Sequence, residues 1–372
     1  MVTKSKRNGT IELFRFIFCI GIIFHHIGTR FYGGELVLDN NFKFFCSGYI
    51  GVEFFFLVSG FLLAKSAMKK DESKAPLGSQ TVTFMKGKIL SLAVPHTIAF
   101  FVAFITGCIV LNVKSSAIPL RFFNSLPCLF FLQKSGIPYI SINSVEWYIC
   151  SMLLCMIIIY PLCKKYQKTY TNIIAPFLGI VTISYLVYKY GTLTRIKVYD
   201  IFTYKCNIRA FAEINLGVCA FAISEKIKNL NYTRFDKFAL TIIEAACYIF
   251  TLYYSLGYLK QIYDVYALMA LFVAIIITFS NTSLFANCFN NKFIYFLGKL
   301  SLHIYLIQVV AKDLIIMVNP NISENVLVTI ITSTIVNIVL GIALMYISVP
   351  FEKILTNKLK KLNKIDTKSL TE

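Results

Sequence analysis

The chain has 372 residues, of which 57% are hydrophobic and only 15% are charged, and its formal net charge is +19. Soluble globular domains carry about 25% charged residues, so this composition excludes an ordinary cytosolic enzyme. The apolar residues occur in blocks of about 18 to 24, the length of α-helix that crosses about 30 Å of hydrocarbon. No polar stretch is long enough to form a separate soluble domain. The sequence therefore predicts a multi-pass membrane protein.

We predict an all-α membrane helix bundle, because a helix satisfies its own backbone hydrogen bonds in lipid and the alternating pattern of a barrel is missing. Hydropathy predicts about ten transmembrane helices, over residues 11–28, 48–66, 89–112, 145–163, 173–190, 207–224, 238–257, 262–280, 294–316 and 326–349. A further apolar run at 122–132 is too short to cross and contains Pro127, so we interpret it as re-entrant or interfacial. If this run did cross, every later helix would be inverted.

Lys and Arg follow the positive-inside rule when the N-terminus is placed in the cytoplasm and ten helices are assumed. Both termini are then cytoplasmic, residues 1–350 form the membrane domain, and residues 351–372 form a basic cytoplasmic tail. Contact of basic segments with anionic lipid headgroups explains most of the net charge, so we expect the bilayer as a partner and no nucleic acid. We expect the chain in the cell membrane, as a bacterial plasma-membrane protein.

The sequence contains no motif for metal binding or nucleotide hydrolysis. The eleven cysteines lie mostly in apolar spans without CxxC or Cys/His metal spacing, so we interpret them as packing residues and expect no metal. Neither a glycine-rich nucleotide loop nor a fixed repeat is present, which weakens nucleotide hydrolysis and repeat-built transport. Glu12 and Arg15 interrupt the first apolar helix and no small-residue cleavage site follows, so we expect this helix to be retained.

The first predicted helix is rich in ionisable residues, in the segment IELFRFIFCIGIIFHHIG. At 100° per residue, His26 lies about 20° from Arg15 around the helix and Glu12 lies about 60° away, so the three form one polar stripe. His25 lies about 80° to the other side of Arg15. Ionisable groups are costly in a membrane, which makes this stripe a candidate functional site. The structural alternative is a carbonyl-bonded His26 and an Arg15 that snorkels to headgroups beside Glu12.

Other polar residues extend this candidate site. Arg15 and His26 are about 16 Å apart along the helix axis, so the arginine is near the inner face and the histidine near the outer one. Glu53 of the second helix is near the depth of His26, where a carboxylate could hold the imidazole tautomer for base catalysis or simply be solvated. Lys86 and Lys88 could bind the phosphates of a cytoplasmic cofactor, although positive-inside anchoring explains them equally well.

The fourth predicted helix opens at the outer surface with Glu146, Trp147 and Tyr148. The only tryptophan of the chain suits either an interfacial aromatic belt or a platform on which a sugar stacks. The ninth helix places His303 and Gln308 within the bilayer, where an unpaired polar group would be expensive. We therefore expect these two side chains to have partners inside the bundle.

Taken together, these segments resemble the acyltransferase-3 family of integral-membrane acyltransferases. The resemblance runs from about residue 8 to residue 350 and is carried by FRFIFCIGIIFHH, GVEFFFLVSGFLL, a basic segment ending at Pro95, EWYICSMLL and FLGKLSLHIYLIQ. It implies transfer of an acyl group, most often acetyl, to carbohydrate hydroxyls of surface polysaccharides, lipopolysaccharide or other glycans. The usual donor in the family is acyl-CoA.

By this resemblance His26 matches the essential histidine of the family, Arg15 matches its partner arginine, and Glu53 stands where relatives usually have Asp or Glu. We expect acyl-CoA, with acetyl-CoA the first choice, to insert its pantetheine arm from the inner face, where Arg15, Lys86 and Lys88 would hold its phosphates. Its thioester would then reach a glycan or lipid-linked glycan near the outer side, contacted by Glu146 to Tyr148. His26 would act as general base or carry the acyl group transiently, oriented by Glu53.

The chain also departs from the family pattern. Lys86 and Lys88 stand in a segment where relatives usually have several arginines, so donor phosphates would be held by point charges instead of bidentate contacts. Gln308 stands where many relatives have histidine, and we assign it no catalytic role. Intramembrane Glu, Arg and His also form proton relays, so the alternative function is a secondary transporter or exporter of a glycan or glycolipid.

Overall fold

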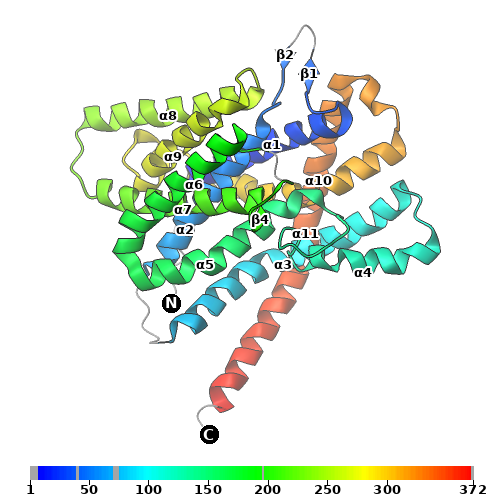
Figure 1. Cartoon of the computed structure of the whole chain (residues 1–372), viewed down its shortest axis with the longest axis horizontal. Coiled ribbons are helices and arrows are strands. Elements are labelled where there is room, and N and C mark those ends of the chain that lie inside the picture. The colour runs from blue at the N-terminus through cyan, green and yellow to red at the C-terminus, as the bar shows by residue number, and fades with distance from the viewer. Residues whose placement is uncertain (1–6, 39–41, 70–74, 195–196, 370–372) are drawn as a thin grey trace.

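The computed structural model describes residues 7–38, 42–69, 75–194 and 197–369, with side chains as far as residue 357. This part of the chain is almost entirely helical (Figure 1). Its strands form two short antiparallel hairpins, β1 (Val37–Leu38) with β2 (Phe42–Lys43) and β3 (Tyr199–Asp200) with β4 (Thr203–Tyr204). The predicted all-α membrane bundle is confirmed.

Ten long helices correspond to the ten predicted crossings. They are α1 (Gly9–Phe31), α2 (Gly51–Ala67), α3 (Leu77–Val110), α5 (Trp147–Thr169), α6 (Ala175–Tyr190), α7 (Lys205–Ile227), α8 (Arg234–Leu256), α9 (Asp264–Ser280), α10 (Lys292–Val318) and α11 (Val326–Ser369). By length and hydropathy, nine helical stretches of the described chain can cross a membrane, and one of these, residues 144–190, contains both α5 and α6. The backbone leaves helical geometry near the end of α5, at Gln167 (φ 41°, ψ −112°), and the π-helical η5 (Tyr170–Ile174) leads into α6.

The short apolar run before α5 forms α4 (Ile118–Leu129), a helix of 12 residues that contains Pro127. Its Phe122 ring lies 5.5 Å from the ring of Phe104 on α3, measured between centroids. A 12-residue helix is too short to span the hydrocarbon core. The structure thus agrees with the interpretation of 122–132 as a segment that does not cross, and the direction of the later helices stays a prediction.

α7 lies at the centre of the bundle, where it packs against α2, α5, α6 and α9. Its closest approach to α2 is at Gly60 and Gly217. A Cβ added at Gly60 would lie 2.0 Å from the carbonyl oxygen of Ile214, and one added at Gly217 would lie 2.2 Å from that of Leu57. Glycine at both positions therefore lets the two backbones touch, which is a common way to pack helices in membranes.

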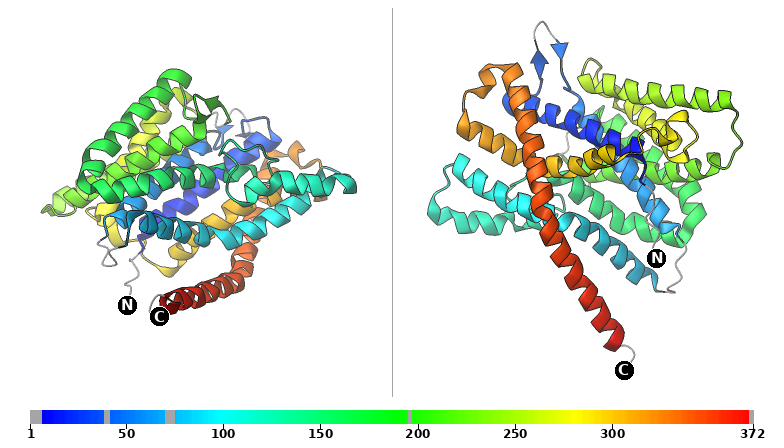
Figure 2. Two further views of the ribbon diagram at one scale, coloured as in Figure 1. Left: turned by 60° about the horizontal axis from the view of Figure 1, so that its bottom comes forward. Right: turned by 180° about the vertical axis from the view of Figure 1, so that it is seen from behind.

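The helices that carry the polar residues lie next to one another. α1 packs against α10 and α2, and α10 packs in turn against α3 and α11. Figure 2 shows that α11 is much longer than its neighbours and extends beyond the bundle at the side where α3 begins. Residues 352–369 thus continue the last helix.

Candidate active site

Three cavities lie one after another along α1, and we name them by the side on which the predicted orientation places them. The inner pocket has a volume of about 630 Å³, the middle pocket about 320 Å³ and the outer pocket about 800 Å³. The inner and middle pockets share the lining residues Arg15, Ser91, Gly298 and Leu302. The middle and outer pockets share Ile22, Val52, Tyr148 and Tyr305. The three pockets therefore adjoin one another in series, and we call this series the path, with Arg15 at its inner end and His26 at its outer end.

His26 lines the outer pocket from the last turns of α1 and is half-buried. Its Nδ1 atom lies 2.6 Å from the Oε1 atom of Gln308 on α10. The amide nitrogen of Gln308 donates to the carbonyl oxygen of Tyr305 at 2.9 Å, which fixes the orientation of the amide group. An amide oxygen can only accept, so Nδ1 of His26 carries the hydrogen and Nε2 keeps a lone pair. This tautomer presents Nε2 as a base, to which no described residue donates a hydrogen bond.

Gln308 is thus a positioning residue that sequence analysis did not find. Its backbone oxygen also accepts a hydrogen bond of 3.1 Å from Nη1 of Arg30, which fixes this part of α10 against α1. The available signal was a polar side chain at bilayer depth in an apolar helix, where some partner was expected. The sequence does not show which partner, because that depends on how α1 and α10 pack.

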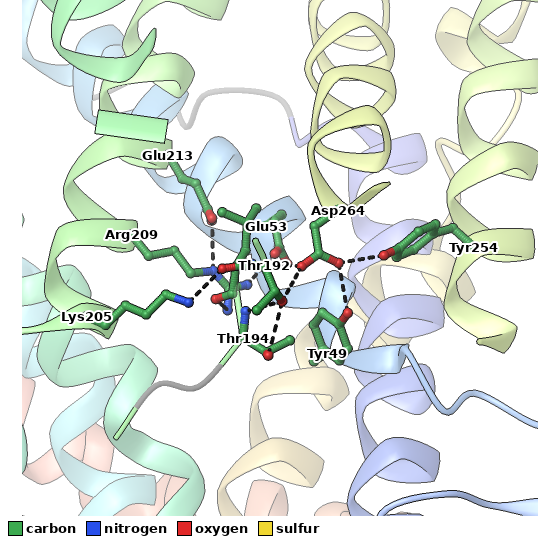
Figure 3. A network of polar contacts seen from close by, with 10 residues as sticks. Tyr49, Glu53, Thr192, Thr194, Lys205, Arg209, Glu213, Tyr254 and Asp264 are labelled. Carbon is green, nitrogen blue, oxygen red and sulfur yellow. Dashed lines mark hydrogen bonds and ion pairs between the residues drawn. The ribbon is translucent and has the colours of Figure 1, made fainter. Parts of the chain in front are cut away.

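Glu53 is fully buried on the first turn of α2 and faces α7. Figure 3 shows its carboxylate beside Arg209, with 2.5 Å between Oε1 and Nη2 of the arginine. Nε of Arg209 donates to Glu213 at 2.9 Å. Among the described contacts, Glu53 makes none with His26, whose imidazole meets Gln308 instead. We therefore revise the expected pairing: a buried carboxylate requires a compensating cation, and Arg209 supplies it.

The same polar network continues to Asp264 at the start of α9. Its carboxylate accepts hydrogen bonds from the hydroxyls of Tyr49 at 2.8 Å, Tyr254 at 2.6 Å and Thr192 at 2.8 Å (Figure 3). Tyr49 lines the outer pocket, so the network fixes one wall of that pocket. The charged residues of this network could be noticed in the sequence because they lie in or beside apolar helices. Which of them contact one another follows only from the packing of the helices.

The three residues predicted at the acceptor side have different positions. Trp147 and Tyr148 line the outer pocket. Glu146 is fully buried and is not among the lining residues of that pocket. Its Oε1 atom lies 3.0 Å from Nδ1 of His96 on α3 and accepts from Asn143 at 3.0 Å. Glu146 therefore anchors the segment before α5 to α3, away from the pocket.

The residues predicted to hold the donor are also separated. Arg15 lines the inner and middle pockets, and its Nη1 lies 3.9 Å from Oε1 of Glu12. Lys88 lines the middle pocket, whereas Lys86 is exposed and lines none of these three pockets. The described residues contain no group of three or more His, Cys, Asp or Glu side chains that could hold a metal ion.

A bundle of membrane-crossing helices that encloses a path ending at a histidine base has the layout of an integral-membrane enzyme. The model of the acyltransferase-3 family, described as an acyltransferase domain, matches residues 8–351. The chain therefore belongs to this family, and the resemblance of its motifs is confirmed. Neither the curated proteins nor the solved structures gave a match to the chain.

Proposed function

We propose that this membrane acyltransferase moves an acyl group, with acetyl the first choice, from cytoplasmic acyl-CoA to a hydroxyl of a cell-surface glycan or its lipid-linked precursor. The observation that carries the proposal is the path between Arg15 and His26. Acyl-CoA is made on the inner side of the membrane and the glycan is assembled or displayed on the outer side. An enzyme that joins them needs a passage for the acyl thioester and a base at its far end.

The inner part of the path suits the nucleotide end of the donor. Arg7, Arg15 and Lys299 line the inner pocket, and cationic side chains hold phosphate groups. Arg7 is already paired with Glu12 at 2.7 Å, which leaves Arg15 and Lys299 as the main phosphate contacts. Further along the path, Lys88 lines the middle pocket among apolar side chains that fit an extended pantetheine arm. Lys86 lines none of the three pockets, so we assign it no contact with the donor.

The outer part of the path supplies the base. Nε2 of His26 accepts the proton of the glycan hydroxyl as its oxygen attacks the thioester carbonyl. The carbon–sulfur bond then breaks, and the sulfur takes that proton from Nε2 of His26 and leaves as the free thiol of CoA, which regenerates the base. Gln308 holds the hydrogen on Nδ1 throughout, which keeps the ring in the basic tautomer. Transient transfer of the acyl group to His26 would use the same Nε2 as nucleophile.

The test is release of free thiol from acetyl-CoA by purified protein in detergent, with a panel of glycans and with His26→Ala. The other three histidines line a pocket or contact Glu146, so none of them offers a neutral control substitution. Thermal unfolding therefore serves to check that His26→Ala is folded. Release that requires both a glycan and His26 is expected. A folded protein that releases no thiol from any acyl-CoA would contradict the proposal and favour the transporter alternative.

A second test addresses the donor end of the path. Arg15→Gln and Lys88→Gln should raise the KM for acyl-CoA, because each removes a cation from the path. Lys86→Gln is the matched control, since this exposed lysine of the same helix lines none of the three pockets. An equal rise in KM for the Lys86 variant would show that general charge near the membrane, and not the path, attracts the donor.

A further inference from the structure

The walls of the outer pocket carry more positive than negative charge. The cationic lining residues are Lys43, Lys197, Arg209 and Lys260. The carboxylate among the described lining residues is Glu35. This imbalance lies at the acceptor end of the path, beside His26, where the proposed donor places no phosphate. The positive charge therefore bears on the charge of the acceptor.

Contacts within the protein neutralise only part of this charge. Lys43 is paired with Glu35 at 3.1 Å, and Arg209 is held by the two glutamates of the buried network. Lys197, in the loop before β3, and Lys260, between α8 and α9, are both exposed. In the described part of the chain neither lysine has an ion-pair partner. Among the described residues, these two ammonium groups at the pocket are thus left without a carboxylate.

Asp200, the carboxylate nearest to Lys197 along the chain, does not neutralise this lysine. Asp200 follows Lys197 by three residues but is bound by Lys189 and by the hydroxyl of Tyr185, which donates at 2.7 Å. Burial raises the pKa of Asp200, but the hydrogen bonds from Lys189 and Tyr185 outweigh it and hold the pKa at about 2. Asp200 is therefore ionised and already paired, so it leaves the charge of Lys197 available to a ligand.

We propose that the outer pocket binds an anionic acceptor, a glycan or glycan precursor that carries a phosphate or carboxylate group near the hydroxyl to be acylated. This inference rests on the proposed function and specifies its acceptor class. Lys197 and Lys260 contact the anionic group as point charges, which suits phosphate and carboxylate alike. Trp147 and Tyr258 line the same pocket and add aromatic surface beside the sugar.

A pocket lined by one sign of charge concentrates ligands of the other sign, and salt weakens this effect. The first experiment compares three acceptor probes, a neutral β-glucan oligosaccharide, an oligogalacturonate and a glycerol phosphate oligomer. The double variant Lys197→Gln/Lys260→Gln should lower kcat/KM for an anionic probe by roughly three- to tenfold and leave the neutral probe unchanged. Lys114→Gln, an exposed lysine of the loop after α3 that lies outside this pocket, is the control.

The two anionic probes separate carboxylate from phosphate as the acceptor group. Preference for either one over the neutral probe, lost in the double variant and at high salt, would support the inference. Equal use of neutral and anionic probes by the wild type would overturn it. An equal loss in the Lys114 control would also overturn it, because the effect would then come from the charge of the whole surface.

A binding experiment separates this inference from the proposed function. The only tryptophan of the chain, Trp147, lines the outer pocket, so its fluorescence reports on ligands there without any acyl donor. Saturable quenching by an anionic probe, weakened in the double variant, would support an anionic ligand even if no acyl-CoA is turned over. Quenching that is equal for all three probes, or unchanged in the double variant, would refute it.

Discussion

The hydrogen bond between His26 and Gln308 gives the sharpest test of the active site. Gln308→Leu keeps a side chain of similar size but removes the acceptor that lies 2.6 Å from Nδ1 of His26. The contact from Arg30 should remain, because it uses the backbone oxygen of residue 308. The substitution therefore isolates the side-chain amide and leaves the packing of α1 against α10 in place.

The expected loss follows from the unpaired N–H of the imidazole. An unsatisfied buried donor costs about 1 to 3 kcal/mol. If the productive tautomer loses that stabilisation, kcat falls by roughly 5- to 150-fold. The KM for acyl-CoA should not change, because Gln308 lines neither the inner nor the middle pocket.

The assay is thiol release at saturating acyl-CoA, with thermal unfolding as the check on folding. Gln308→Glu is the matched control, since a carboxyl oxygen can still accept from Nδ1 and should restore much of the rate. Wild-type kcat in the leucine variant would refute the positioning role. So would an equal loss in the glutamate variant, which would indicate that the amide acts in some way other than by accepting this hydrogen bond.

Three other predictions concern the scaffold and its orientation. Glu53→Leu breaks a buried ion pair and should destabilise the protein by about 3 to 5 kcal/mol, measured as a lower unfolding temperature. Normal stability together with a lost rate of thiol release would instead indicate a direct catalytic role of Glu53. Gly60→Ala places a Cβ 2.0 Å from a carbonyl oxygen of α7 and should lower stability by about 1 to 3 kcal/mol, whereas Gly78→Ala, which meets nothing within 4 Å, should have no such effect. A membrane-impermeant thiol reagent should modify Cys46 of the outer pocket in intact cells, and exposed Cys288 only after permeabilisation. The reverse order, read by mass spectrometry of the peptides, would contradict the predicted orientation.

The helices were predictable because crossing a bilayer imposes a length and an apolar composition that single segments display. The stripe of Arg15 and His26 was predictable for a similar reason, since both residues belong to one helix with a known rotation per residue. The positions of Arg15 at the inner end and His26 at the outer end of the path agree with this reasoning.

The partners of these residues could not be predicted. Sequence gives the depth of a residue in the membrane, but its neighbours depend on the rotation of each helix and on which helices touch. Glu53 and His26 have similar predicted depths, yet one faces α7 and the other α10. Glu146 was expected at the outer surface beside Trp147, whereas the structure buries it against His96. The ion pair of Glu53 with Arg209 belongs to the interface of α2 with α7, which two glycines allow to pack closely.

The path along α1 also matters for the electrical insulation of the membrane. A continuous water column from the inner to the outer face would let protons and small ions leak and would run down the electrochemical gradient. The walls shared by the middle and outer pockets, Ile22, Val52, Tyr148 and Tyr305, are apolar and aromatic. The hydroxyl of Tyr305 already donates to the backbone oxygen of Val145, and that of Tyr148 is hydrogen-bonded with Ser59. An ion at this level would therefore exchange its hydration water for few ligands, which is how hydrophobic constrictions block conduction. Under the proposed function, a neutral acyl thioester would meet no such barrier, so these four side chains would admit the donor arm and still keep the bilayer sealed.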